Sequence, residues 1–130
     1  PILKAIAALG DAVVRPGYLS RADAILLLRG ARACVYPSLY EGFGLPVLEA
    51  MAARTPVITS NVSALPEVAS DAALYADPHS AESIAHAVEQ VLNDPNAAAA
   101  RVSIGRARAE SFSWEKSAGK LASLYRDLAN

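Results

Sequence analysis

Residues 38–51 read Ser-Leu-Tyr-Glu-Gly-Phe-Gly-Leu-Pro-Val-Leu-Glu-Ala-Met, and this stretch decides the fold. The apolar run before it, residues 33–37, has the composition of a short strand and ends in a proline. Pro46 suits the first position of a helix, and residues 47–53 tolerate or favour helix. The stretch therefore predicts a strand, a glycine-containing loop and a helix start, which is where open α/β sheets bind ligands.

The loop has the composition of an anion-binding site. Gly42 and Gly44 let a ligand approach the backbone because they carry no Cβ. The amides of residues 44–47, apart from the proline, are expected to point at an anion on the helix axis. Glu41 and Glu49 flank this position, and a carboxylate accepts two hydrogen bonds from a sugar diol. A phosphate at the helix end with diols on either side indicates a nucleotide sugar.

The stretch also resembles a known signature. E-G-F-G-L-P-x-x-E, with seven residues between its glutamates, is similar to the E-x7-E motif of retaining glycosyltransferases with two Rossmann-like domains, the GT-B architecture. Residues 55–60 and 65–68 resemble that family too, and the similarity runs from about Val14 to the C-terminus. The resemblance implies that Glu41 is the catalytic contact to the donor sugar and that Glu49 binds the ribose. It assigns donor-sugar and diphosphate binding to the backbone of Gly42, Phe43, Gly44 and Leu45.

Four neighbouring polar residues are candidate contacts in the same crevice: Tyr40, Thr59, Ser60 and Asn61. Tyr40 either lines the sugar or base pocket or packs against the fold. The other three end the next expected strand, where ligand contact and a local turn role are both open, and Ser63 is a candidate helix cap. A glycosidase acid/base pair is the competing chemistry, but such carboxylates flank the bond from separate elements, whereas Glu41 and Glu49 share one loop and helix.

Bulk composition narrows the function class. The 130 residues fit one domain, and a hydrophobic content of 53% is ample for a core. A net charge of −1 provides no basic field for nucleic acid, so no nucleic-acid partner is expected. The single Cys34 excludes a disulfide within the chain and a cysteine metal cluster, and a buried thiol is expected. No metal or other cofactor is expected. The predicted location is cytoplasmic, with the inner face of the membrane as the alternative for a longer protein.

The pattern along the chain predicts an α/β fold, a Rossmann-like parallel sheet with flanking helices. Expected strands are 12–14, 33–36, 57–59 and 73–76, and expected helices are 1–9, 21–29, 46–53, 66–69, 80–93, 95–110 and 114–128. The last three strands should lie side by side and parallel. The strand at 12–14 should either pair with the strand at 33–36 or be covered by a second chain in a homodimer. The apolar stripe from Trp114 to Leu128 is expected to face the core.

The resemblance also implies that residues 1–130 are the C-terminal part of a GT-B donor-binding domain, because its first strands and glycine turn have no counterpart. The family's acceptor domain and its basic pair for the leaving diphosphate are missing too, so the chain alone is expected to transfer no sugar. GDP-mannose is the preferred donor, because the motif looks most like mannosyltransferases of polysaccharide assembly, and a UDP-sugar is the alternative. An inactive nucleotide-binding module, or a piece completed by a partner chain, remains open.

Arg54 departs from the family pattern, which usually carries glycine there. A left-handed backbone at this position would cost an arginine about 1 kcal/mol relative to glycine.

Overall fold

The computed structural model describes residues 2–129, and its centre is a parallel three-stranded sheet. The strands β1 (Cys34–Tyr36), β2 (Val57–Ser60) and β3 (Ala73–Ala76) lie in that order across the sheet. Cys34 pairs with Val57, which in turn pairs with Ala73. The expected parallel neighbours are therefore confirmed, as is the α/β class.

Helices occupy most of the remaining chain, close to the expected bounds. Pro1, which was expected to begin the first helix, lies outside the described residues. The helices are α1 (Ile2–Leu9), η1 (Gly10–Ala12), α2 (Arg21–Gly30), α3 (Leu45–Ala52), α4 (Leu65–Ala69), η2 (Ser70–Ala72), α5 (Ala81–Asn93), α6 (Pro95–Glu110) and α7 (Trp114–Leu128).

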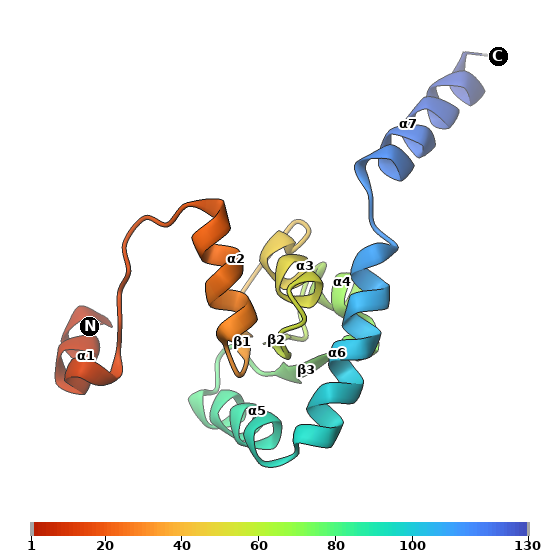
Figure 1. The fold of residues 1–130 in the computed structure, drawn as a ribbon. Helices are drawn as coiled ribbons and strands as arrows, with labels where there is room; N and C mark the ends of the chain where they lie inside the picture. The colour runs from red at the N-terminus through yellow and green to blue at the C-terminus, as the bar shows by residue number, and fades with distance from the viewer. Residues whose placement is uncertain (1, 130) are drawn as a thin grey trace.

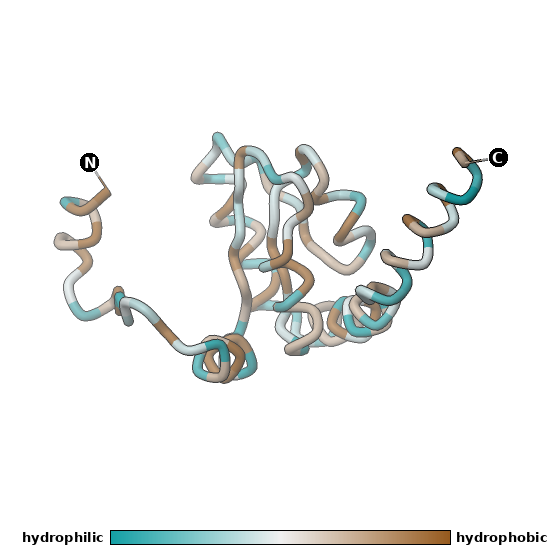
Figure 2. The backbone as a smooth tube through the Cα atoms, turned by 90° about the horizontal axis from the view of Figure 1, so that it is seen from above, coloured by the Kyte–Doolittle hydropathy of each residue, from teal (hydrophilic) through white to brown (hydrophobic). Residues whose placement is uncertain are grey.

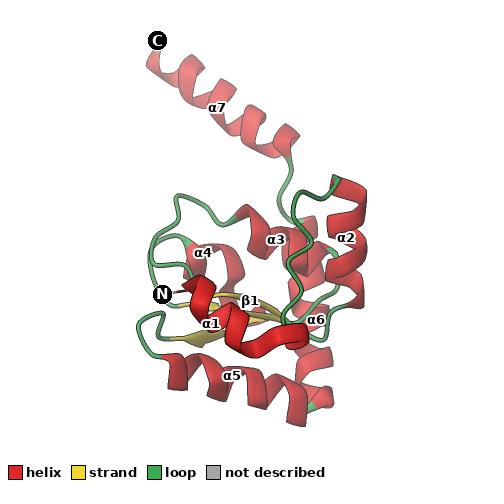
Figure 3. Ribbon diagram, turned by 90° about the vertical axis from the view of Figure 1, so that its left-hand side faces the viewer, coloured by secondary structure: helices red, strands yellow, loops and turns green. Residues whose placement is uncertain are grey.

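The helices cover the two faces of the sheet in separate layers (Figures 1 and 3). Val57 belongs to a buried cluster with Val47 and Met51 of α3 and with residues of α4. The next residue, Ile58, belongs to a second cluster with α5 residues such as Val91. Because adjacent strand residues point to opposite faces, β2 is buried on both sides and is the centre of the core.

Side-chain caps begin four of the helices, as their sequences predict. The hydroxyl oxygens of Ser20, Ser80 and Ser113 accept the amide N–H three residues ahead, at 3.2, 3.1 and 3.2 Å. Asp94 Oδ1 accepts the N–H of Ala97 at 2.9 Å. These bonds satisfy amides that have no acceptor inside the helix, so the starts of these helices are locally encoded.

The prediction of a strand at residues 12–14 is wrong. Ala12 ends the short helix η1, and the chain then runs as an irregular segment to Ser20, with Val14 81% exposed. Gly10 has φ +52°, in keeping with its expected place at the end of α1. A three-residue strand needs a neighbouring strand for its hydrogen bonds. In the described sheet β1 pairs with β2 and not with residues 12–14. The predicted pairing of residues 12–14 with β1 is therefore wrong. The homodimer remains a prediction, but residues 12–14 give no reason for it, because they form no strand with an edge to cover.

The apolar stripe of α7 does not face the core. The helix stands away from the sheet (Figure 1), and brown apolar positions recur along its length beside teal polar ones (Figure 2). Trp114 and Leu128 are 81% and 75% exposed, and α7 has no buried residue. An amphipathic pattern predicts an apolar face but not the surface that covers it. None of the described helices has both the length and the apolarity to cross a membrane.

Arg54 has the left-handed backbone that its position suggests, with φ +65°. It follows Ala53, the C-cap of α3, and its N–H donates to the Met51 carbonyl at 3.0 Å. This is the helix-ending position that usually holds glycine, because a Cβ is strained there.

We predict that Arg54→Gly raises the free energy of unfolding by about 1 kcal/mol, measured by urea denaturation. Arg54→Ala is the matched control, because it removes the same charge but keeps a Cβ in the left-handed region. Equal stabilities of the two variants would show that charge, and not backbone strain, sets the effect.

Candidate functional site

The loop from β1 to α3 contains two glycines with different structural needs. Gly44 is the N-cap of α3 and has φ +100°, and a Cβ built there would lie 2.7 Å from Leu65 Cδ2. A Cβ on Gly42 would meet nothing within 4 Å. The fold therefore requires glycine at 44, whereas Gly42 leaves open space beside the loop.

The amides at the start of α3 only partly match the expectation. Among the described residues, the N–H groups of residues 42–45 have no protein acceptor. The amide of Val47, which was also expected to be free, donates to the Gly44 carbonyl at 3.0 Å, so that expectation is wrong. The left-handed Gly44 turns its carbonyl toward the first turn of α3. The available donors are therefore the loop amides up to Leu45, at the positive end of the helix dipole.

Glu41 is held through one of its two carboxylate oxygens. The Tyr36 hydroxyl donates a hydrogen bond to Oε1, and the Ser38 hydroxyl donates to the same atom at 2.9 Å. The other oxygen, Oε2, has no hydrogen bond to any described residue. The bonds from Tyr36 and then Ser38 lower the pKa of Glu41, because they stabilise its charged form. The same contact raises the pKa of Tyr36.

Ser63 holds the backbone of the loop rather than capping the next helix. It has φ +52°, and its hydroxyl oxygen accepts the N–H of Glu41 at 2.9 Å. The N-cap of α4 is Ala64, which offers no side-chain bond, so the expected cap is wrong. A polar residue 22 positions along the chain therefore fixes the backbone of Glu41.

The candidate crevice residues fall into two groups. Thr59 and Ser60 are fully buried, and their hydroxyls donate to the carbonyls of Tyr36 and Ser38, the former at 2.9 Å. These bonds hold the carboxyl end of β1 against the end of β2. Asn61 is exposed, as is the side chain of Tyr40, at 80%. The alternative that the Tyr40 side chain packs against the fold is therefore not supported within residues 2–129.

Glu49 is the fifth residue of α3 and lies on its exposed side. No hydrogen bond or ion pair joins its carboxylate to any other described side chain. Its carboxylate is therefore available to a ligand on the exposed side of α3, one turn beyond the loop.

An aromatic contact that the sequence did not predict ties the loop to Phe112, which follows the end of α6. The rings of Phe43 and Phe112 meet edge to face, with centroids 5.6 Å apart. The Arg108 guanidinium lies 4.8 Å from the Phe112 centroid, and its Nε donates to the Val68 carbonyl at 3.1 Å. A cavity of about 660 Å³ lies against Gly42 and Phe43, with residues of α6 and α7 on its other side. No local sequence pattern predicts a contact between residues this far apart. An aromatic side chain in a loop indicates only that it packs against some part of the fold.

A parallel sheet whose β1–α3 loop presents unpartnered amides and a fixed carboxylate defines a Rossmann-like ligand-binding domain. The family description "Glycosyl transferases group 1" matches residues 3–108. The chain therefore belongs to the group 1 glycosyltransferases.

Several relatives share this part of the sequence. The chain is 44% identical over 110 residues to O-antigen chain mannosyltransferase B of Escherichia coli, covering 85% of this chain and 29% of that protein. It is 40% identical over 112 residues to glycogen synthase of Mycobacterium tuberculosis, covering 84% and 27%. It is 37% identical over 131 residues to the MMP alpha-(1->4)-mannosyltransferase of Mycolicibacterium hassiacum, covering 96% and 32%.

A solved structure has the same fold. The chain is similar to sucrose-phosphate synthase from Thermosynechococcus elongatus, with a TM-score of 0.85 and 36% identity. The match covers 97% of this chain and 32% of that one. The chain thus spans about a third of the length of these proteins, and the similarity supports a GT-B-type α/β fold.

We predict that Tyr36→Phe raises the pKa of Glu41 toward its ordinary value, because one of the two donors to Oε1 is lost. Carbon-13 NMR titration of the carboxyl group measures this. Folding lowers the pKa of Glu41, so its stabilising effect is present above the unfolded pKa and is lost as the pH falls through the folded value. Tyr36→Phe should therefore make the stability that is lost on acidification smaller.

The control for this titration is Tyr75→Phe, because the Tyr75 hydroxyl donates to the Ser70 carbonyl and not to Glu41. An unchanged Glu41 titration in Tyr36→Phe would contradict the role of the hydroxyl.

We predict that Gly44→Ala destabilises the chain by about 1–3 kcal/mol, since the new Cβ meets both a left-handed backbone and the Leu65 side chain. Gly42→Ala should change stability by less than about 0.5 kcal/mol, because its Cβ faces open space. Thermal unfolding of both variants measures these two changes in stability. Comparable losses would show that the loop is equally constrained at both glycines.

Proposed function

We propose that this chain is the donor-binding part of a retaining glycosyltransferase that takes a hexose from a nucleotide diphosphate sugar. Residues 1–130 act as the C-terminal part of its nucleotide-sugar-binding domain, and an N-terminal domain binds a sugar or lipid-linked glycan acceptor. The supporting observation is the β1–α3 loop, which has unpartnered amides at a helix start between Glu41 and Glu49. The proposed reaction uses no metal and no cofactor other than the donor.

The diphosphate occupies the start of α3. The amides of residues 42–45 donate to its oxygens, and the partial positive charge of the helix end favours the anion. Gly42 lets the donor approach closely because no side chain stands there. Phe112 holds Phe43 in place, so the loop keeps its shape before the donor arrives and less ordering is required on binding.

Glu49 binds the ribose. Its carboxylate is exposed and has no partner among the described side chains, so both oxygens are available to the two hydroxyls of the sugar. The diol is common to nucleotides and nucleotide sugars, and this contact therefore contributes equally to both.

Glu41 orients the transferred sugar. Tyr36 and Ser38 occupy Oε1 and keep the carboxylate ionised, which leaves Oε2 for a hydroxyl of the donor hexose. A fixed negative charge there also favours the positive charge that develops at the anomeric carbon. The bond from that carbon to the diphosphate oxygen breaks, and its electron pair leaves with the diphosphate. The acceptor oxygen bonds to the same face, and its proton passes to the leaving diphosphate oxygen.

The proposed donor is GDP-mannose, and the relatives named mannosyltransferases, including the two described above, support mannose as the transferred sugar. The relatives named glycogen synthase and sucrose-phosphate synthase support a second candidate, a glucosyl donor carried on UDP. Calorimetric titration of the chain with GDP and UDP separates the two, because the preferred nucleotide base should bind more tightly. Failure of both nucleotides to bind would overturn the proposal.

We predict that Glu49→Ala weakens GDP and GDP-mannose binding alike, by roughly 10- to 150-fold, because hydrogen bonds to a charged acceptor are lost. Glu41→Ala should leave GDP affinity unchanged and weaken GDP-mannose alone. Isothermal titration calorimetry measures both. Glu89→Ala on α5 is the control, since it removes an exposed glutamate far from the loop.

The division of roles would be wrong if Glu41→Ala and Glu49→Ala lost GDP affinity equally. In a longer protein that contains this chain, Glu41→Ala should lower turnover with GDP-mannose, whereas the 130 residues alone should give none.

A further inference from the structure

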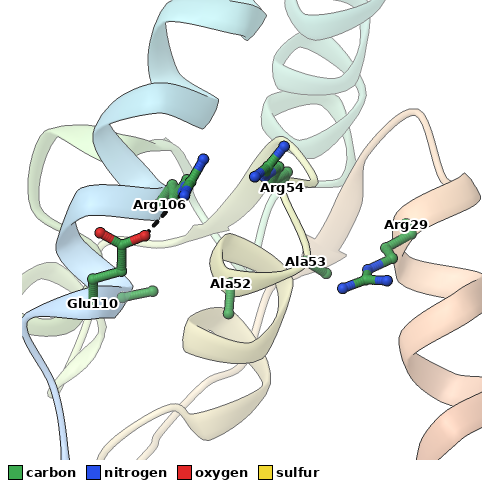
Figure 4. Close-up of a pocket in the computed structure, with 7 residues that line it drawn as sticks. Arg29, Ala52, Ala53, Arg54, Arg106 and Glu110 are labelled. Carbon is green, nitrogen blue, oxygen red and sulfur yellow. Dashed lines mark hydrogen bonds and ion pairs between the residues drawn. The ribbon is translucent and has the colours of Figure 1, made fainter.

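A second cavity lies at the opposite end of α3 from the loop. It has a volume of about 700 Å³ and is bounded by α2, the end of α3 and α6. Figure 4 shows Arg29, Arg54 and Arg106 around it, with Ala52 and Ala53 between them. The eight residues of α3 separate this cavity from the loop by about 12 Å along the helix.

The charged side chains that line this cavity are mostly positive. Three arginines and one glutamate give a net charge of +2. Arg106 donates through Nε to Glu110 at 2.9 Å, and that pair is about half exposed. Among the described residues, the guanidinium groups of Arg29 and Arg54 have no hydrogen bond or ion pair. Like charges gathered without counterions repel one another, and a bound anion removes that repulsion.

Capping of helix ends does not account for these two arginines. Cations near the last turn of α2 and α3 do interact favourably with the helix dipoles. A capping side chain, however, donates to the last carbonyls of its helix, and neither Arg29 nor Arg54 does so within residues 2–129. Both side chains are exposed at the cavity, with all their donors available.

Arg54 adds an independent observation. Its backbone is left-handed, where glycine carries no strain, and yet the chain has a long cationic side chain there. Strain of this kind is characteristic of positions that serve a function. Its side chain lines this cavity between Arg106 and Arg29 (Figure 4).

We propose that this cavity binds a small soluble anion with two or more negative charges on phosphate groups, held by Arg29, Arg54 and Arg106. The planar guanidinium fork matches two phosphate oxygens, and charge-assisted hydrogen bonds of this kind are stronger than neutral ones. The concave shape between three helical segments suits a compact ligand rather than a flat membrane surface.

The test is an NMR titration of the nitrogen-15-labelled chain with sodium pyrophosphate, at constant ionic strength set with sodium chloride. The side-chain Nε–H signals of Arg29 and Arg54 should shift saturably. Arg54→Gly should weaken this binding by about tenfold or more, as judged from the Arg29 signal. Arg54→Gly removes backbone strain, so loss of folding does not explain a loss of binding. Arg15→Gly in the exposed segment before α2 is the matched control and should bind as the parent does.

Four results would overturn the proposal. One is a shift of the arginine signals that does not saturate, and another is an unchanged affinity in Arg54→Gly. The third is a response confined to the amides of residues 42–45, which would place pyrophosphate only in the loop at the start of α3. In a last experiment, binding of the chain to vesicles of phosphatidylglycerol is measured. Vesicle binding that depends on Arg54, without a response to pyrophosphate, would assign the arginines to a lipid headgroup and reject the soluble ligand.

Discussion

Gly44 joins the loop to α3 in a left-handed conformation that leaves no room for a side chain beside Leu65. This close approach sets where α3 begins, and so which of its residues turn inward. Val47 and Met51 then reach the core, and Met51 in turn packs against Gly105 of α6, where an added Cβ would lie 3.1 Å from its Cγ. Close approaches at two glycines, Gly44 against Leu65 and Gly105 against Met51, therefore occur at the two sides of α3.

The polar network around Glu41 depends on the same geometry. Tyr36 ends β1, Ser38 follows it, and Ser63 approaches from beyond β2, so two separate segments hold one glutamate. The buried hydroxyls of Thr59 and Ser60 keep those segments together. Bonds to Oε1 and to the backbone N–H restrict the orientation of the carboxylate and leave Oε2 unpaired, which is what a group that must meet a bound sugar requires.

Much of this organisation could be predicted from sequence, because the signals are local. Serine and aspartate caps, prolines in first turns and short apolar runs mark elements within a few residues, and a strand–helix alternation implies a parallel sheet. The left-handed backbone of Arg54 was foreseen only as a condition, because the family usually has glycine at that position. The loop at the start of α3 and its two glutamates follow from the same reasoning, together with a motif of fixed spacing.

The order of the elements, the parallel sheet and the position of the glycine loop thus follow from local sequence signals. Only the tertiary structure decided that residues 12–14 form no strand and that the apolar side of α7 remains exposed, because both depend on a partner surface. It alone brought Ser63 to Glu41, Phe112 to Phe43 and the three arginines to one cavity. These contacts join residues far apart in the chain, and local conformational preferences carry no information about which distant side chains will meet.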